Sequence, residues 1–168
     1  MIFGLPGSGK SRFALQLSFI LGTPLYHLDR YFFIKNWVER DPQEFLKIQQ
    51  AIVDKHSWII DGNSIRSLEM RYSKADAAIY FHFNRYLCLW RIFKRLLCKE
   101  ADIQDRADGC KERISLRLIR YMWSFNKKIQ PILKDLHQKY PYVDFYIFYN
   151  DHDLKNFLAL KSFVVKEF

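Results

Sequence analysis

One eight-residue stretch near the start of the chain constrains the fold more than any other feature. Residues 4–11 read GLPGSGKS and match the pattern G-x-x-x-x-G-K-[ST] at every fixed position. The apolar residues 1–3 before it are typical of a strand end, and residues 10–21 have helical periodicity that stops at Gly22. Glycines in such a loop permit positive φ angles, so the backbone turns sharply and points several N–H groups inward. The stretch therefore predicts a strand, a tight loop and a helix in that order.

The chemistry of this loop indicates a site for nucleotide phosphates. Inward N–H groups and the positive end of the following helix dipole both attract anions. Lys10 adds a point charge for the β- and γ-phosphates, and the Ser11 hydroxyl is a ligand for Mg²⁺. The alternative is a purely structural glycine-rich turn, and the pattern allows ATP or GTP without implying turnover. The candidate nucleotide-binding residues are Gly4, Gly7, Ser8, Gly9, Lys10 and Ser11.

The remainder of the chain alternates between short apolar runs and longer stretches of helical periodicity, without repeats or a linker. Its length of 168 residues fits one domain, so residues 1–168 are expected to form a single α/β domain. The predicted strands are residues 1–3, 25–28, 58–60, 77–83 and 143–149. The predicted helices are residues 10–21, a helix capped by Asp41, residues 84–99, 112–125 and 131–139, and a last helix capped by Asp153. Strands joined by helical crossovers of this length pair in parallel, with helices on both faces of the sheet.

Two aspartates that follow predicted strands are candidates for phosphate chemistry. Asp61 follows the apolar run Trp58–Ile60, and a carboxylate at this place beside a phosphate loop holds Mg²⁺, often through water. Asp29 ends the second predicted strand, and the carboxyl ends of parallel strands meet at one edge, where ligands bind. Asp29 could therefore orient an acceptor hydroxyl or contact metal-bound water. Either aspartate could instead only cap a turn or a helix.

The positive charge of the chain is concentrated in one segment. The net charge is +9, and residues 85–139 alone hold 14 basic and 6 acidic side chains. Three interpretations fit this segment: an arginine-rich element that closes on nucleotide phosphates, a nucleic-acid surface, or a solvated helical face. Arg91 and Arg95 within it are four residues apart and therefore share one face of a helix.

Four separated motifs resemble one group of proteins. They are Tyr26-His27-Leu28-Asp29, Trp58–Asn63, Cys88–Arg95 and Gly109–Arg113, and with the phosphate loop they span nearly the whole chain. The combination resembles the adenylate-kinase-related P-loop kinases, and among them a bacterial group labelled topology modulation proteins. The resemblance implies a P-loop NTPase fold, a three-layer α/β/α sandwich with a five-stranded parallel sheet in the order 2-3-1-4-5. It also implies a helical lid between the fourth and fifth strands, at about residues 99–113.

The resemblance further implies a kinase that uses Mg²⁺ and ATP to phosphorylate a nucleotide or another small molecule. ATP and Mg²⁺ are the only cofactors that it implies, and Ser11 and Asp61 would be the metal ligands. The residues expected to serve catalysis are Lys10, Asp29, Asp61, Arg91 and Arg95. Arg91 and Arg95 would also contact the nucleotide, and Arg106 and Arg113 of the lid would close over its phosphates.

The chain departs from adenylate kinases on the acceptor side. Adenylate kinases follow Asp-Gly with Phe-Pro-Arg, whose arginine holds the acceptor monophosphate, whereas Asn63–Arg66 stands here. AMP is therefore not the expected acceptor. Arg66 and Arg71 could serve a different acidic acceptor, or they are surface charges. The aromatic residues Tyr31–Phe33 and Trp37 form either the wall of an acceptor pocket or a hydrophobic anchor under a loop.

A second functional hypothesis stays open beside the kinase. The protein could be a nucleotide-switched ATPase or a DNA-associated regulator that uses the basic residues 85–139, as the label of the resembling group suggests. The segment shows no winged-helix, zinc-finger or RNP motif. Nucleic acid is therefore a weakly supported partner, and an unidentified small molecule is the favoured one.

The composition argues against several other classes of protein. Three cysteines at wide spacing, without C-x-x-C, argue against a disulfide framework or a zinc site and favour free thiols. No run of apolar residues approaches the roughly 20 needed to span a bilayer, and the start is unlike a signal peptide, so a soluble, cytoplasmic protein is expected. His27 and His82 are expected to be mostly buried and hydrogen-bonded, and Phe81 and Phe83 to belong to the core. The oligomeric state is left open.

Overall fold

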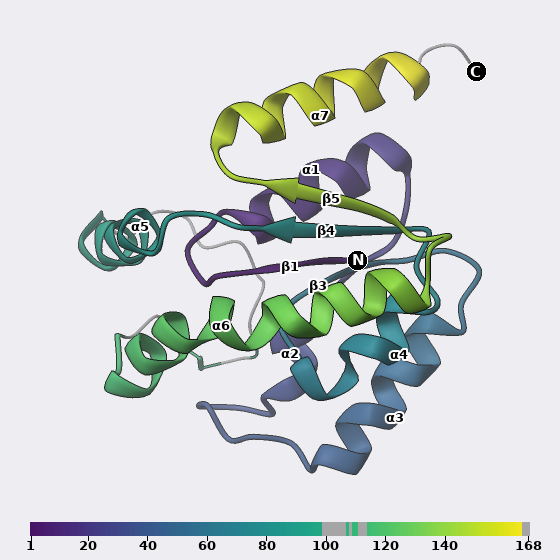
Figure 1. The fold of residues 1–168 in the computed structure, drawn as a ribbon. Coiled ribbons are helices and arrows are strands. Elements are labelled where there is room, and N and C mark those ends of the chain that lie inside the picture. Colours follow the sequence, from purple (N-terminus) through teal and green to yellow (C-terminus); the bar gives the residue numbers. More distant parts are fainter. Residues whose placement is uncertain (99–106, 108, 111–113, 166–168) are drawn as a thin grey trace.

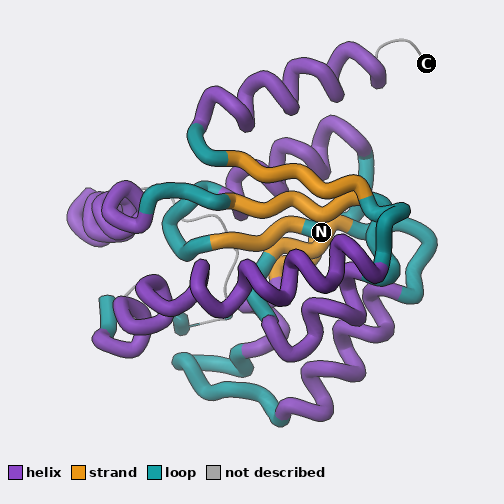
Figure 2. The backbone as a smooth tube through the Cα atoms, in the orientation of Figure 1, coloured by secondary structure: helices purple, strands orange, loops and turns teal. Residues whose placement is uncertain are grey.

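The centre of the protein is a sheet of five short strands, coloured orange in Figure 2. The computed structural model describes residues 1–98, 107, 109–110 and 114–165. The strands are β1 (Ile2–Gly4), β2 (Leu25–His27), β3 (Ile59–Asp61), β4 (Ala77–Phe81) and β5 (Asp144–Phe148). All neighbouring strands are parallel, and their order is β2-β3-β1-β4-β5. The predicted five-stranded parallel sheet and its order are therefore confirmed, and the loop after β1 emerges between β3 and β4.

Helices cover both faces of the sheet (Figure 1). The described helices are α1 (Lys10–Leu21), α2 (Leu28–Phe32), α3 (Pro42–Val53), η1 (Ile65–Ser67, a 3-10 turn), α4 (Leu68–Tyr72), α5 (Arg85–Cys98), α6 (Leu116–Lys139) and α7 (Asp151–Val165). Helices α1 and α7 pack together on one face, and α6 runs across the other beside α4. An ion pair of 2.5 Å between Lys139 and Glu69 joins α6 to α4. None of these described helices is long and apolar enough to cross a membrane.

Alternation along β4 divides the core between the two faces. Phe81 points to the α1 side, where its ring lies 5.4 Å from that of Phe13. Its neighbour Tyr80 points to the α6 side, and its hydroxyl donates a hydrogen bond of 3.0 Å to Asn126. Phe81 and Phe83 are buried, as predicted. Because successive side chains of a strand point to opposite faces, a strand covered on both sides is apolar throughout.

Two helix starts show how local capping signals act. Asp41 caps α3 as predicted, because its carboxylate accepts hydrogen bonds from two backbone N–H groups of the first turn. At α7 the cap is Asn150, whose side chain accepts from the N–H groups of His152 and Asp153. Asp153 instead reaches back to the N–H groups of Tyr149 and Asn150. The prediction of Asp153 as the cap was therefore wrong, since Asp153 takes the third helical position of a reciprocal capping arrangement.

The prediction of two helices over residues 112–139 was wrong as well. The two helices were expected at residues 112–125 and 131–139, and proline is unfavourable inside a helix because it lacks the N–H that continues it. The structure has one helix, α6, which Ser115 caps by accepting from the N–H of Leu118 and which continues through Pro131. Its buried residues recur at spacings of three or four and face the core: Met122, Phe125, Ile129, Leu133 and Leu136. Burial of this continuous stripe outweighs the hydrogen bond lost at the proline.

The predicted lid lies almost entirely outside the described residues. Residues 99–106, 108 and 111–113 are not described, and the predicted lid arginines Arg106 and Arg113 are among them. Within the described turn at 109–110, the sulfur of Cys110 accepts a hydrogen bond of 3.2 Å from the backbone N–H of Trp37. Cys88 and Cys110 are buried free thiols, as expected.

Candidate functional site

Residues 4–11 run from the end of β1 through a tight loop into the first turn of α1, at the carboxyl edge of the sheet. Gly4, Gly7 and Gly9 have φ angles of 147°, 78° and 92°, which confirms the positive φ angles predicted for this loop. Gly9 occupies the N-cap of α1, and none of the described side chains caps that helix end. The first N–H groups of α1 are therefore available to an anion, together with the positive end of the helix dipole.

Asn63 holds the first residue of this loop from a neighbouring strand. Its side-chain oxygen accepts a hydrogen bond of 2.9 Å from the N–H of Gly4, and its side-chain nitrogen donates one of 2.6 Å to the carbonyl of Gly4. The two residues are 59 positions apart in the sequence. No role was predicted for Asn63, and the only local signal was its place two residues after the strand-end Asp61.

Asp61 is buried beside the loop and is held by a histidine of the adjacent strand. The strands β2 and β3 bring His27 opposite Asp61, and the two side chains are 2.9 Å apart, from His27 Nδ1 to Asp61 Oδ2. His27 is thus buried and hydrogen-bonded as predicted, but its contact with Asp61 was not foreseen. The second oxygen, Asp61 Oδ1, and the hydroxyl of Ser8 are buried without a hydrogen-bond partner among the described residues. A buried carboxylate oxygen without a partner is expensive unless a ligand or ion completes it.

The surroundings of Asp61 keep it ionised. Burial opposes ionisation, but the hydrogen bond from His27, the charge of Lys10 and the hydroxyl of Ser11 together hold the pKa of Asp61 below its ordinary value of 3.8. The carboxylate is therefore charged at neutral pH and lies within the influence of the two loop residues expected to bind phosphate and metal.

This pKa shift predicts a difference in acid stability between the protein and Asp61→Asn. A depressed folded-state pKa adds stability that is fully present above pH 3.8 and is lost as the pH falls through the lower folded value. The free energy of unfolding of the wild type should therefore fall more steeply than that of Asp61→Asn below about pH 4. Urea unfolding at a series of pH values measures both slopes. Parallel slopes in this range would contradict the assignment.

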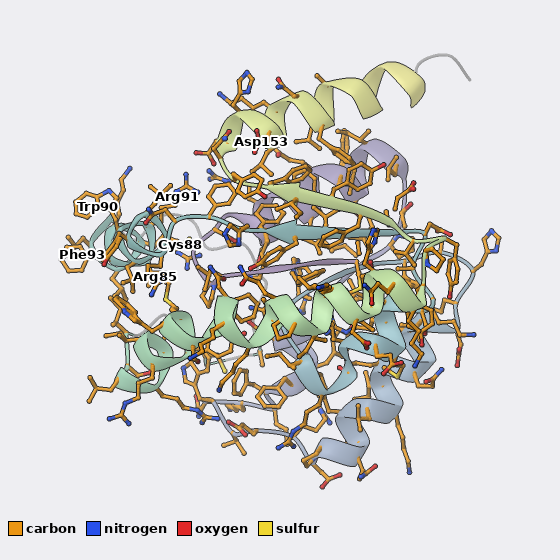
Figure 3. The ribbon with its side chains drawn as sticks, viewed as in Figure 1. Arg85, Cys88, Trp90, Arg91, Phe93 and Asp153 are labelled. Atoms are coloured by element: carbon orange, nitrogen blue, oxygen red, sulfur yellow. The ribbon has the colours of Figure 1, made fainter. Side chains whose placement is uncertain are left out.

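Arg91 contacts the loop from α5. Its guanidinium donates a hydrogen bond of 3.3 Å to the carbonyl of Ser8 and pairs with Asp151 at 2.5 Å. Figure 3 shows Arg91 on the side of α5 toward the start of α7, whereas Trp90 and Phe93 point away from the sheet. Arg95, one turn further along α5, is half-buried. The structure thus brings Arg91 to the loop, and the contact of either arginine with a nucleotide stays a prediction.

The close approach of the loop to α5 requires glycine at position 7. A Cβ atom added to Gly7 would lie 2.4 Å from the carbonyl oxygen of Cys88 and 2.8 Å from a side-chain carbon of Ile92. Both the positive φ of 78° and the backbone contact therefore exclude a side chain at this position.

We expect Gly7→Ala to lower the free energy of unfolding by about 2–4 kcal/mol, because it adds a clash with fixed backbone to the strain of a positive φ. Gly22→Ala is the matched control. Gly22 has a φ of 61° with nothing within 4 Å of an added Cβ, so that variant should cost only about 1 kcal/mol, from backbone strain alone. Chemical denaturation of both variants makes the comparison, and equal losses would show that the contact with α5 is not tight.

A pocket of about 330 Å³ opens next to the loop. Its walls come from the loop, from residues 29–39, from Asn63 and from the start of α6, and they are Pro6, Lys10, Asp29, Phe32, Phe33, Trp37, Glu39, Asn63, Ser115, Arg117, Leu118 and Tyr121. Phe32, Phe33 and Trp37 therefore line a pocket, whereas Tyr31 does not line it and packs, like Phe32, against the second core cluster. Whether this pocket holds an acceptor stays a prediction. Arg117 and Glu39 form an ion pair of 2.9 Å in this wall.

Asp29 lines this pocket together with Lys10. Asp29 lies in the first turn of the short helix α2 and not at the end of β2, because the strand predicted over residues 25–28 ends at His27. The pKa of the Tyr121 hydroxyl is raised well above its ordinary range, mainly because the hydroxyl is buried and also because of the negative charge of Asp29. The lysine of the loop and the predicted acceptor-side carboxylate therefore face one cavity.

The two arginines considered for an acidic acceptor differ in their exposure to solvent. Arg66 is exposed in η1. Arg71 is fully buried and donates hydrogen bonds to the carbonyls of Gly62, Ser64 and Ser67. Burial lowers the pKa of Arg71 to about 10. Arg71 is therefore neither a surface charge nor a lining residue of the pocket, and it secures the backbone after β3.

Comparisons with known proteins do not assign a family to this chain. No protein-family model and no curated protein matches the chain. A solved structure described as an uncharacterized protein from Eubacterium ventriosum ATCC 27560 aligns over 99% of this chain and 97% of its own, at 13% identity and a TM-score of 0.47. A likeness at that level carries no inference about function.

Proposed function

We propose that the protein is a P-loop phosphotransferase that binds Mg²⁺ and ATP at residues 4–11 and transfers the γ-phosphoryl group to a small molecule in the adjacent pocket. The observation that carries this proposal is that Lys10 and Asp29 line the same cavity. An enzyme that only hydrolyses ATP needs no acceptor cavity beside its phosphate-binding lysine. A kinase needs one, because donor and acceptor must meet in line.

The nucleotide side of the site rests on the loop. The inward N–H groups and the N-terminus of α1 would bind the phosphates, and Lys10 would neutralise charge on the β- and γ-phosphates. Arg91 also lies at the loop, 3.3 Å from the carbonyl of Ser8, and its charge is partly balanced by Asp151. Phosphoryl transfer is accelerated mostly by charges and N–H donors that are already in position before the reaction, and these groups would supply them.

The residues that would hold Mg²⁺ are Ser11 and Asp61. Asp61 Oδ1 is buried and has no described hydrogen-bond partner, and hard oxygen ligands suit this ion. Mg²⁺ commonly takes one or two protein ligands and completes its shell with phosphate oxygens and water. When bound, the ion would supply charge neutralisation between the β- and γ-phosphates. His27 would keep the carboxylate of Asp61 in its orientation through the 2.9 Å contact.

The acceptor side of the site rests on Asp29. A carboxylate at this place can accept the proton of an acceptor hydroxyl as the oxygen attacks the γ-phosphorus. The aromatic residues of the pocket wall would hold the acceptor and exclude water, which is the competing nucleophile.

No specific observation favours the DNA-associated alternative. Several basic side chains of residues 85–139 pair with acids of the same chain: Arg91 with Asp151, Arg117 with Glu39 and Lys139 with Glu69. These pairs reduce the charge that the described part of the segment presents to a polyanion. We therefore propose the kinase alone.

Two measurements test the proposal. Calorimetric titration should detect Mg²⁺·ATP binding, and ADP release should rise when a suitable acceptor from a small-molecule panel is added. Acceptor-dependent ADP release supports a kinase. Absence of Mg²⁺·ATP binding, or ADP release that no acceptor changes, would contradict it.

A further inference from the structure

We propose that the protein has a second ligand site, on the α6 side of β5, which binds a single planar ring that carries one negatively charged group and one hydrogen-bond donor. The site is a cavity of about 280 Å³ between α6 and the neighbouring strands β4 and β5. Its described lining residues are Tyr80, His82, Gln130, Leu133, Lys134, His137, Phe145, Ile147 and Tyr149. None of them lines the cavity beside Lys10, so this inference does not depend on the proposed function.

The two cavities use different parts of α6. The cavity beside Lys10 is lined by residues from 115–121, and the second cavity by residues from 130–137. Because a helix rises 1.5 Å per residue, Ser115 and Gln130 are about 22 Å apart along its axis. The α6 residues of the second cavity recur at helical spacing and therefore share one flank of the helix: Gln130, Leu133, Lys134 and His137.

The floor of the second cavity is one face of the edge strand β5, whose side chains alternate between the two sides of the sheet. On the α1 side, Phe148 is only 5% exposed and contacts the ring of Phe13. On the α6 side, Ile147 and Tyr149 are 39% and 57% exposed. Strands of a parallel sheet are ordinarily covered on both faces, so this surface is open to a ligand. With Phe145, it offers apolar and aromatic contact to a flat ring.

Hydrogen bonds fix the role of His82 at one end of the cavity. The hydroxyl of Tyr80 donates at 3.0 Å to Asn126 and lies 3.1 Å from Nδ1 of His82. Burial raises the pKa of Tyr80 well above its ordinary range, so the hydroxyl keeps its proton at neutral pH. Because that proton goes to Asn126, Nδ1 of His82 is the donor in the second contact, and Nε2 of the neutral ring is an acceptor. Nε2 has no partner among the described residues, so a hydroxyl or amino group of a ligand can donate to it.

Positive charge lies toward the other end of the cavity. The ring of His82 is 5.5 Å from that of Tyr149, directly after β5. The ring of His137 is 5.8 Å from that of Phe145, at the start of β5. Lys134, on the same flank of α6 as His137, forms no ion pair within the described part of the chain. No acidic side chain is among the described lining residues, so this end favours an anionic group.

Size and charge favour a small ligand over a second copy of the chain. Cavities that hold drug-sized ligands span about 300–1,000 Å³, so 280 Å³ suits a single ring. A second copy seated on this face would bring the same cations against Lys134 and His137, which is unfavourable. The anionic group can be a carboxylate or a phosphate, because a lysine attracts either as a point charge.

The first test is a titration of the isotope-labelled protein, without nucleotide, followed by NMR. 4-Hydroxybenzoate should bind at one site with a Kd of about 1 mM or tighter. Benzoate lacks the donor, 4-hydroxybenzyl alcohol lacks the charge and cyclohexanecarboxylate lacks the planar ring, so each should bind about ten-fold more weakly or less. Binding of 4-hydroxyphenyl phosphate, compared with 4-hydroxybenzoate, identifies the preferred anion. Equal binding of the charged and neutral ring compounds, or no binding of either anion, would overturn the inference.

The second test places the ligand in this cavity. Lys134→Met keeps the length of the side chain but removes its charge, and should weaken binding of 4-hydroxybenzoate about ten-fold. Lys128→Met is the matched control, because Lys128 is an exposed lysine of α6 outside the cavity. Equal effects of the two variants would contradict the site.

A third variant fills the cavity. Ile147→Trp should abolish binding and leave the fold intact, since Ile147 is partly exposed and a larger side chain has room there. Unchanged binding in this variant would overturn the proposal. So would a dimer of the wild type, seen by analytical ultracentrifugation, that Ile147→Trp converts to a monomer, because the face would then belong to a second copy.

Discussion

Lys10→Ala is expected to reduce phosphoryl transfer by about three orders of magnitude. Lys10 is the first residue of α1, directly after the loop that follows β1, and it lines the cavity in which donor and acceptor would meet. Its removal would leave the developing charge on the transferred phosphoryl group without its principal protein partner. ADP formation with Mg²⁺·ATP and an active acceptor measures the loss.

The fold should survive this change. Lys10 is half-buried at the start of α1, and alanine is the best helix former, so the midpoint of thermal unfolding should stay close to that of the wild type. Lys47→Ala is the matched control, because Lys47 is an exposed lysine of α3 away from the pocket. Turnover by Lys10→Ala at a rate close to the wild type would show that residues 4–11 are not the phosphate site.

Asp61→Asn is expected to lower activity by about two to three orders of magnitude, with a smaller loss of nucleotide affinity. Asparagine keeps the size of the side chain and can still bond His27, but it removes the charge that would hold Mg²⁺. The concentration of Mg²⁺ needed for half-maximal ADP formation should therefore rise in this variant.

Asp135→Asn is the control for this second change, since Asp135 is an exposed carboxylate of α6. It should leave both activity and Mg²⁺ dependence as they are. An unchanged Mg²⁺ dependence in Asp61→Asn would reduce Asp61 to a structural partner of His27.

The elements that the sequence predicted well are those whose signals are local. Helix α1 begins at Lys10 and ends at Leu21, as predicted, because glycines adopt the left-handed conformation at both of its ends. The start of α3 follows from Asp41, whose carboxylate bonds N–H groups two and three residues ahead. The positive φ angles of Gly4, Gly7 and Gly9 also follow from local steric rules. In contrast, the order of the strands was predicted from a family resemblance and not from the periodicity of the sequence.

The site itself depended on contacts between residues distant in sequence. Asn63 and Gly4 are hydrogen-bonded although they lie 59 positions apart in the sequence, and His27 and Asp61 lie 34 apart. No rule of sequence spacing predicts either pair. Arginine is usually a surface residue, yet Arg71 is fully buried. Its guanidinium donates hydrogen bonds to the carbonyls of Gly62 and Ser64 after β3.

The sequence by itself therefore determined the local features of this protein: the glycine-rich loop after β1, the acid at the end of β3, and the alternation of strands and helices that builds a parallel sheet. Only the tertiary structure decided that Lys10 and Asp29 share a cavity, that Trp37 faces it, and that α6 continues through Pro131. The physical reason is the range of the forces involved. Steric limits on φ and capping hydrogen bonds act within a few residues, whereas burial and pocket shape arise only when distant segments pack together.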